Sequence, residues 1–141
     1  MSSPVSVPRG SLRVLEESRA REKAQTTYYR ALAAHAVSGV DDDVTERLND
    51  LHADEQHHLS RLTARLLELG HVPSDLSAHS VSGGELDGWE EEAREREAEE
   101  VRWYEAVTGL ELDEATLVVL GDILASERHH LRDLRGKWMS A

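Results

Sequence analysis

The chain contains the stretch Ala53-Asp54-Glu55-Gln56-His57-His58-Leu59, and it contains a near copy, Ala125-Ser126-Glu127-Arg128-His129-His130-Leu131. Each stretch carries the pattern Glu-x-x-His. Residues three apart on a helix lie one above the other on the same face. Each stretch therefore presents a carboxylate and an imidazole in the same direction, about one turn apart. Two such pairs that faced each other would form a pocket of oxygen and nitrogen ligands.

Both stretches lie in segments with the apolar spacing of an amphipathic helix. The first segment begins near Asp41–Asp43 and is expected to end at Gly70. Its inner stripe reads Val44, Leu48, Leu51, Glu55, His58, Leu62, Leu66 and Leu69. The second segment has Asp113 as its expected N-cap and Gly136 as its expected end. Its inner stripe reads Leu117, Leu120, Leu124, Glu127, His130 or Leu131, and Leu134.

One further helix is expected before each of these two. Ser11 is the expected cap of a helix that runs to about Val37. Its inner stripe reads Leu15, Ser18, Glu22, Thr26, Tyr29, Ala33 and Ala36. The other helix is expected from about Glu85 to about Gly109. Its inner stripe reads Trp89, Ala93, Glu97, Glu100, Tyr104 and Val107.

These segments predict an all-α fold, a four-helix bundle with one long crossover connection between the second and third helices. The crossover is a segment of about fourteen residues, 71–84, rich in Pro, Ser, Gly and His. A length of 141 residues suits a single domain. We expect a flexible N-terminal tail over 1–10, the bundle over 11–136 and a short C-terminal tail over 137–141.

The two halves of the chain resemble each other beyond the Glu-x-x-His pairs. Residues 21–32 read REKAQTTYYRAL, and residues 96–107 read REAEEVRWYEAV. This alignment matches Glu22 with Glu97 and Tyr29 with Tyr104. Each half therefore supplies one glutamate from its first helix and one Glu-x-x-His pair from its second helix.

The four glutamates of this pattern favour a pair of metal ions. A single Glu-x-x-His pair is expected by chance in so acidic a chain, and on its own it would indicate only surface charge. Here, however, every glutamate is in register with the apolar stripe of its helix and lies near the middle of that helix. Burying four carboxylates together carries a prohibitive free-energy cost without compensation, whereas two divalent cations would cancel their four negative charges. Ligands that are all oxygen and imidazole suit iron or manganese, and zinc remains an alternative.

The overall composition and charge argue against several kinds of site and partner. The chain has no cysteine, which excludes disulfides, thiolate metal sites and a cysteine nucleophile and fits a reducing, cytoplasmic location. A net charge of −12 argues against nucleic acid or an anionic membrane surface as partner. No apolar run approaches membrane-spanning length, and no signal peptide is expected.

Together these residues resemble the ferritin-like di-iron carboxylate proteins, and within that group the di-iron domain of rubrerythrins. The resemblance covers about residues 12–136. It implies two iron ions, bridged by Glu55 and Glu127. It implies terminal ligands in Glu22, Glu97, His58 and His130. Rubrerythrins carry an additional glutamate one turn after the third-helix ligand, and Glu100 stands at that position, where the alternative is surface charge.

The resemblance also implies an activity, the reduction of hydrogen peroxide, or reaction with oxygen, at the iron pair. Tyr29 and Tyr104 would hydrogen-bond carboxylate ligands and take part in catalysis, although both also suit a bundle core. Asp54 is placed to reach His130 across the bundle. Rubrerythrins proper carry a cysteine-bound iron that delivers electrons, and this sequence without cysteine implies an external electron donor. The alternatives are a ferroxidase or iron-storage protein, and a quinone-pathway hydroxylase, which the acidic helices disfavour. We expect a homodimer.

Overall fold

The computed structural model describes residues 9–37, 42–79, 81 and 84–139, and the side chains of all of these except 37 and 135–139. Within these residues it contains four α-helices, one short 3-10 helix and no strand. The elements are α1 (Arg9–Val37), α2 (Asp42–Glu68), η1 (Ser77–His79), α3 (Trp89–Thr108) and α4 (Glu114–Met139). The predicted all-α four-helix bundle is confirmed.

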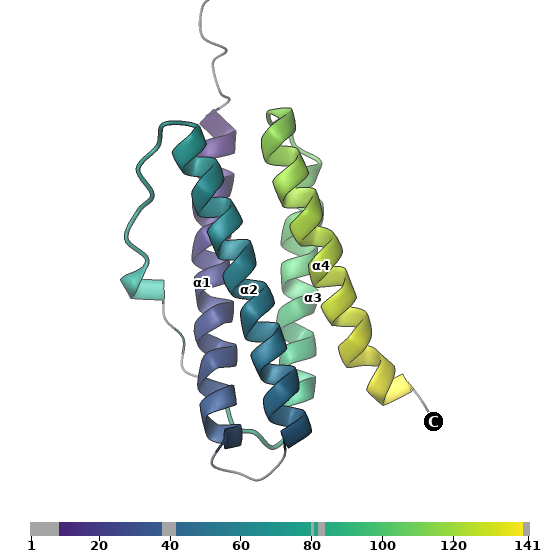
Figure 1. Ribbon diagram of the computed structural model, residues 1–141. Coiled ribbons are helices and arrows are strands. Elements are labelled where there is room, and N and C mark those ends of the chain that lie inside the picture. Colours follow the sequence, from purple (N-terminus) through teal and green to yellow (C-terminus); the bar gives the residue numbers. More distant parts are fainter. Residues whose placement is uncertain (1–8, 38–41, 80, 82–83, 140–141) are drawn as a thin grey trace, which may run out of the picture.

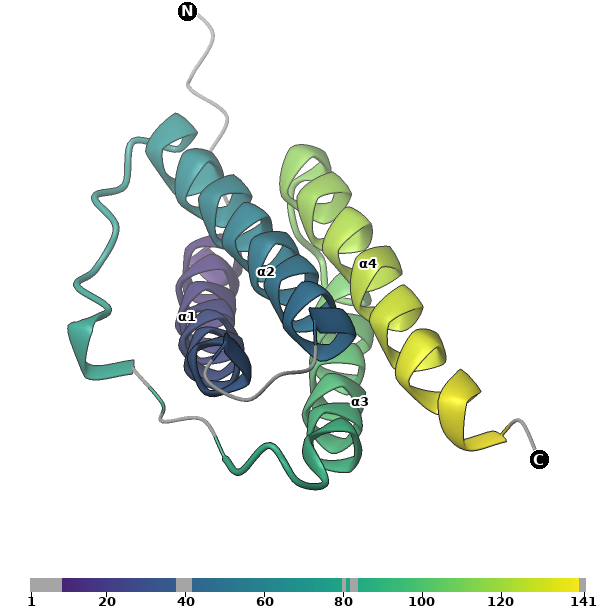
Figure 2. The same ribbon diagram turned by 60° about the horizontal axis from the view of Figure 1, so that its bottom comes forward.

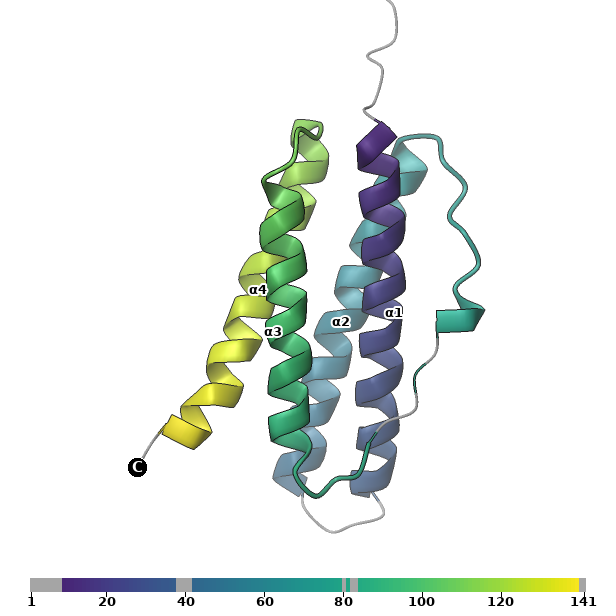
Figure 3. The ribbon, with the colours of Figure 1, turned by 180° about the vertical axis from the view of Figure 1, so that it is seen from behind.

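The helices form two antiparallel pairs, α1 with α2 and α3 with α4 (Figure 1). The connection from α2 to α3 runs along the outside of α1 from one end of the bundle to the other, and η1 lies within it (Figures 2 and 3). As a result α2 and α3 point in the same direction, and the predicted crossover between the second and third helices is confirmed. Each half of the chain therefore folds as one antiparallel pair.

The four predicted inner stripes face the core of the bundle. All the named stripe residues of α1 and α3 are buried, as are most of those of α2 and α4. The apolar residues form two separate clusters, one containing Leu15, Leu62 and Leu120, the other containing Leu32 and Leu48. The glutamates of the four stripes lie in the helix turns between these clusters. The core therefore holds a polar layer between two apolar layers.

Three helix ends differ from the predictions. Helix α1 begins at Arg9, so Ser11 is not its cap; the Ser11 side chain is buried and its hydroxyl donates to Asp113 Oδ1 at 2.7 Å. Helix α3 begins at Trp89, four residues after Glu85, because Gly88 has a φ of 74°. That left-handed backbone geometry stops the helix from extending further toward the N-terminus. Helix α4 continues past Gly136 to Met139. Residues 1–8 and 140–141 of the two predicted tails lie outside the described residues.

Asp113 caps α4, as predicted, and also ties three helices together. Its Oδ2 accepts the backbone N–H of Thr116 at 3.1 Å and a guanidinium N–H of Arg65 at 2.8 Å, while its Oδ1 accepts from Ser11. Burial alone would raise the pKa of Asp113, but these hydrogen bonds lower it well below its usual range. The carboxylate is therefore charged, and it stabilises the end of the bundle near the start of α1.

Replacing Asp113 with alanine will lower the free energy of unfolding by about 2 kcal/mol, because the variant loses a helix cap and the nearest carboxylate partner of the part-buried Arg65. The depressed pKa means that this contribution is present above about pH 4 and is lost only in stronger acid. Urea denaturation at pH 7 measures the difference. Asp122→Ala is the matched control, since Asp122 is exposed and contacts only Arg61 among the hydrogen bonds described. Equal losses in the two variants would contradict the cap assignment.

Candidate metal centre

Each helix supplies one fully buried glutamate at the middle of the bundle. The four are Glu22 of α1, Glu55 of α2, Glu97 of α3 and Glu127 of α4. One turn after Glu55 and Glu127, the buried side chains of His58 and His130 point into the same layer. Four carboxylates and two imidazoles, far apart in the sequence, thus meet in the polar layer of the core.

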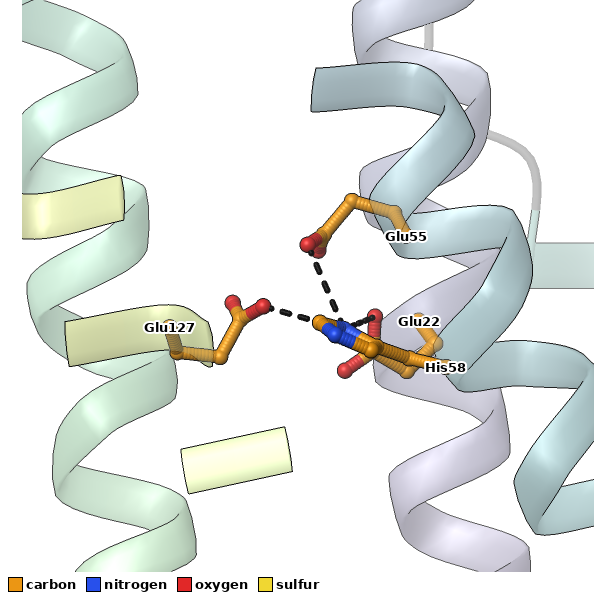
Figure 4. A group of neighbouring side chains, drawn as sticks. All are labelled: Glu22, Glu55, His58 and Glu127. Carbon is orange, nitrogen blue, oxygen red and sulfur yellow. Dashed lines mark ion pairs between the residues drawn. The ribbon is translucent and has the colours of Figure 1, made fainter. Parts of the chain in front are cut away.

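The six side chains form two overlapping groups, each with the geometry of a metal site. The first group is Glu22, Glu55, His58 and Glu127 (Figure 4). The second group is Glu55, Glu97, Glu127 and His130. In each group one potential ligand atom per residue lies within 4.8 Å of all the others. Glu55 and Glu127 belong to both groups, so these two carboxylates are placed to bridge two neighbouring ions.

The inward-facing atoms are close together but are not hydrogen-bonded to each other. His58 Nδ1 lies 3.1 Å from Glu127 Oε1 and 3.6 Å from Glu22 Oε2. His130 Nδ1 lies 3.5 Å from Glu55 Oε1 and 3.7 Å from Glu97 Oε1. Both histidine Nδ1 atoms and both oxygens of Glu55 and of Glu127 are buried without a hydrogen-bond partner. Buried polar atoms are almost always paired, so this cluster fits a pair of divalent cations that would satisfy them.

The electrostatics of the site are those of an uncompensated anionic pocket. Burial, and then repulsion from Glu127, raises the pKa of Glu22, Glu55 and Glu97 above the ordinary value. Burial lowers the pKa of the histidines, but their contacts with the carboxylates outweigh it. The pKa is raised to about 9 for His58 and to about 11 for His130. Without metal, the pocket therefore holds protons at neutral pH, and cations that bind there must displace them.

The two tyrosines of the repeat link the halves of the bundle. Tyr29 donates to Glu97 Oε1 at 2.7 Å, and Tyr104 donates to Glu22 Oε1 at 2.7 Å. Both rings are fully buried, so each hydroxyl orients a carboxylate of the opposite half. The hydrogen bonds predicted for these tyrosines are present, and their part in catalysis stays a prediction.

His130 has a carboxylate behind it, and His58 has none at the matching position. Asp54 Oδ2 lies 2.8 Å from His130 Nε2, which is the contact predicted across the bundle. Such a carboxylate fixes the orientation of a ligand imidazole and increases its basicity. The residue of α4 that corresponds to Asp54 is Ser126. A cavity of about 330 Å³, lined by both Asp54 and His129, leads from the surface to His130.

Sequence reasoning missed one buried polar residue near the site, Gln25. It lies one turn after Glu22 on α1, is 1% exposed, and accepts a hydrogen bond from Arg96 at 2.7 Å. The alignment of the two halves contains the signal that would have found it, because it matches Gln25 with Glu100. Glu100 is itself buried, not a solvated member of the acidic run, and lies near Glu22.

Comparisons with known proteins bear on the fold. The sequence matches no model of a known protein family and no curated protein sequence. Among solved structures, the chain is similar to the dodecameric thioferritin of Bacteroides fragilis, described as a bacterioferritin-related protein. The identity is 18%, the match covers 89% of this chain and 84% of that chain, and the TM-score is 0.72. The chain thus adopts the ferritin-like four-helix bundle fold. No helix in the described ranges is long and apolar enough to cross a membrane.

Proposed function

We propose that the protein binds two iron ions in the polar layer and oxidises ferrous iron with oxygen or hydrogen peroxide, as a ferroxidase. One observation carries the proposal: two ligand groups share Glu55 and Glu127, and the ligand atoms that face inward have no other partner. The ferritin-like fold supports it, as does the name of the similar structure, a thioferritin. Manganese, or a mixed pair, suits the same ligands.

In this proposal the protein groups have distinct tasks. Glu55 and Glu127 would be shared by the two ions, Glu22 and His58 would hold one of them, and Glu97 and His130 would hold the other. When bound, a ferrous pair would supply the two electrons that, with two protons, reduce one hydrogen peroxide to two water molecules. The tyrosine hydroxyls hold the terminal carboxylates in place. The apolar layers close the site along the bundle, so access is from the side, through the cavity beside His130.

A rubrerythrin-like peroxidase is the second candidate, and Glu100 favours it. This residue stands where rubrerythrins carry their additional glutamate, and burial, followed by repulsion from Glu22, raises its pKa to about 8. A carboxyl group with that pKa is poised to exchange a proton near neutral pH. In this second function the protein would turn over peroxide continuously with electrons from an external donor. We place either reaction in the cytoplasm.

Anaerobic titration of the metal-free protein with ferrous iron tests both candidates. We expect binding to saturate at two irons per chain, and the bound iron to be oxidised when oxygen or peroxide is added. A ferroxidase will go on oxidising further ferrous iron beyond two equivalents. A peroxidase will consume peroxide only while a reductant is supplied. Retention of many irons per chain would indicate storage, and no binding at all would refute the metal site.

The oligomeric state belongs to the same proposal. We expect a homodimer, and the thioferritin named above is a dodecamer, which makes a larger assembly the alternative. Light scattering on the purified protein, with and without iron, measures the mass directly. Two irons per dimer, in place of two per chain, would mean that the site forms between chains.

A further inference from the structure

The two halves of the metal centre differ at one pair of matched positions. The separation of 75 residues that matches Glu22 with Glu97 also matches Gln25 with Glu100. Each member of the second pair lies one turn after a terminal glutamate ligand and on the same helix face. One position carries a carboxylate and the other carries a neutral amide.

The surroundings of Glu100 are those of a held carboxylate. Arg21 donates to Glu100 Oε1 at 3.2 Å, and the Arg21 guanidinium lies 4.5 Å from the centre of the Trp103 ring. The other oxygen, Oε2, is buried and has no hydrogen-bond partner. Glu100 is held next to Glu22, because Arg21 directly precedes Glu22 on α1, and Tyr104, one turn after Glu100 on α3, donates to Glu22 Oε1 at 2.7 Å. It therefore lies beside the position of the first ligand group, which contains His58.

The surroundings of Gln25 repeat this arrangement on the other side. Arg96 donates to Gln25 Oε1 at 2.7 Å, and the Arg96 guanidinium lies 4.1 Å from the centre of the Tyr28 ring. Since an arginine can only donate, the amide oxygen must face Arg96 and the amide nitrogen must face away from it. That nitrogen, Nε2, is buried and has no hydrogen-bond partner.

The difference matters for a bound cation. A carboxylate oxygen can coordinate a cation or balance its charge, whereas an amide N–H₂ group can only donate a hydrogen bond. Affinity for hard divalent cations rises with the number of charged oxygen ligands. The position near Glu100 has one more carboxylate than the position near Gln25. In addition, Arg96 is paired there with the neutral amide of Gln25, which does not cancel the positive charge of the guanidinium.

We propose that Glu100 and Gln25 make the two metal positions unequal, so that the first divalent cation binds on the His58 side and the second binds on the His130 side. This inference rests on the proposed function, because it requires a di-metal site. Asp54 favours the opposite order by supporting His130. The Asp54 side chain is 55% exposed, so solvent screens its charge. It also contacts the His130 imidazole and would affect a cation only through that ring. The buried difference between Glu100 and Gln25 therefore decides the order.

Manganese(II) tests this order, because it is stable against oxidation under anaerobic conditions. Crystals of the protein loaded with one equivalent should show anomalous density mainly on the His58 side, and calorimetry should show two binding steps. In Gln25→Glu the second step should tighten about tenfold and the two positions should fill together, as expected for a change beside the ligands. In Glu100→Gln the first step should weaken by a similar factor, about tenfold.

Gln56→Glu is the matched control, since it adds the same charge at an exposed position of α2 next to a ligand. We expect it to leave both binding steps unchanged. Equal occupancy in the unmodified protein, first occupancy on the His130 side, or a Gln25→Glu variant that behaves like Gln56→Glu would overturn the inference. Circular dichroism verifies folding, and Glu100→Gln decides the question if Gln25→Glu does not fold. Absence of manganese from both positions would refute the proposed metal site itself.

Discussion

Glu127→Gln will abolish tight binding of both metal ions. Glu127 belongs to both ligand groups, is fully buried, and has two oxygens without a hydrogen-bond partner. The amide removes one negative charge and replaces one coordinating oxygen with a nitrogen that can only donate. Because both positions lose a bridging ligand, we expect the affinity of each to fall by at least about 100-fold. Ferrous iron or manganese titration under anaerobic conditions measures this, and oxidation activity will be lost with the metal.

Substituting a ligand that belongs to only one of the two groups tests each metal position separately. Glu22→Gln removes a ligand of the first group only, and Glu97→Gln removes a ligand of the second group only. Each should retain about one ion per chain, in contrast to Glu127→Gln. The matched control is Glu105→Gln, because Glu105 is exposed and pairs with Arg128 at the surface. Two ions bound to Glu127→Gln with unchanged affinity would show that the cluster is not the metal site.

Metal binding will raise the melting temperature substantially, and the increase will be larger at higher pH. In the metal-free protein the pKa is raised for Glu22, Glu55 and Glu97, for His58 to about 9 and for His130 to about 11, whereas contacts with the two histidines lower it for Glu127. The folded state thus binds protons more tightly than the unfolded chain does. The contribution of these groups to stability is therefore fully present below their unfolded pKa values, near 4.3 and 6.5, and is lost as the pH rises toward the folded values. The metal-free protein should melt at a lower temperature at pH 9 than at pH 6.

Bound cations reverse this trend because they replace the protons that the site would otherwise hold. With free manganese at about 1,000 times the dissociation constant, one site contributes about 4 kcal/mol, which corresponds to about 10 °C for a domain of this size. Thermal scans at pH 6, 7.5 and 9, with manganese or with chelator, measure the effect. Glu127→Gln provides the control, since its melting temperature should not respond to manganese. An increase that shrinks as the pH rises would contradict proton displacement at the site.

The local pattern of the sequence was enough to predict the helices and the faces that they bury. Leucines at intervals of three and four place Glu55 and His58 on the buried side of α2, and the same spacing serves α4. The positions of helix ends were harder to predict. Ser11 has the side chain of a helix cap, but its hydroxyl is used by Asp113, 102 residues away. Gly88 was overlooked as the point where α3 begins.

Predictions that are more specific than the fold have less support. The ferritin-like fold is confirmed, whereas the resemblance to rubrerythrins in particular stays a prediction. Fold alone does not determine which oxidant or donor reacts at a site, because proteins of one fold carry out different chemistry. The clustered ligands support iron binding, and the ferroxidase interpretation now has the stronger support.

The sequence by itself determined the candidate ligands, because burial on a helix follows a period of 3.6 residues that can be read along the chain. It also determined the repeat that matches Gln25 with Glu100. Only the tertiary structure decided which residues meet across the bundle: Tyr29 with Glu97, Asp54 with His130, Arg96 with Gln25. Such contacts depend on the distance and rotation between packed helices, which no local pattern encodes. The same packing decided that Gln25 and Glu100 are both buried beside the candidate metal centre.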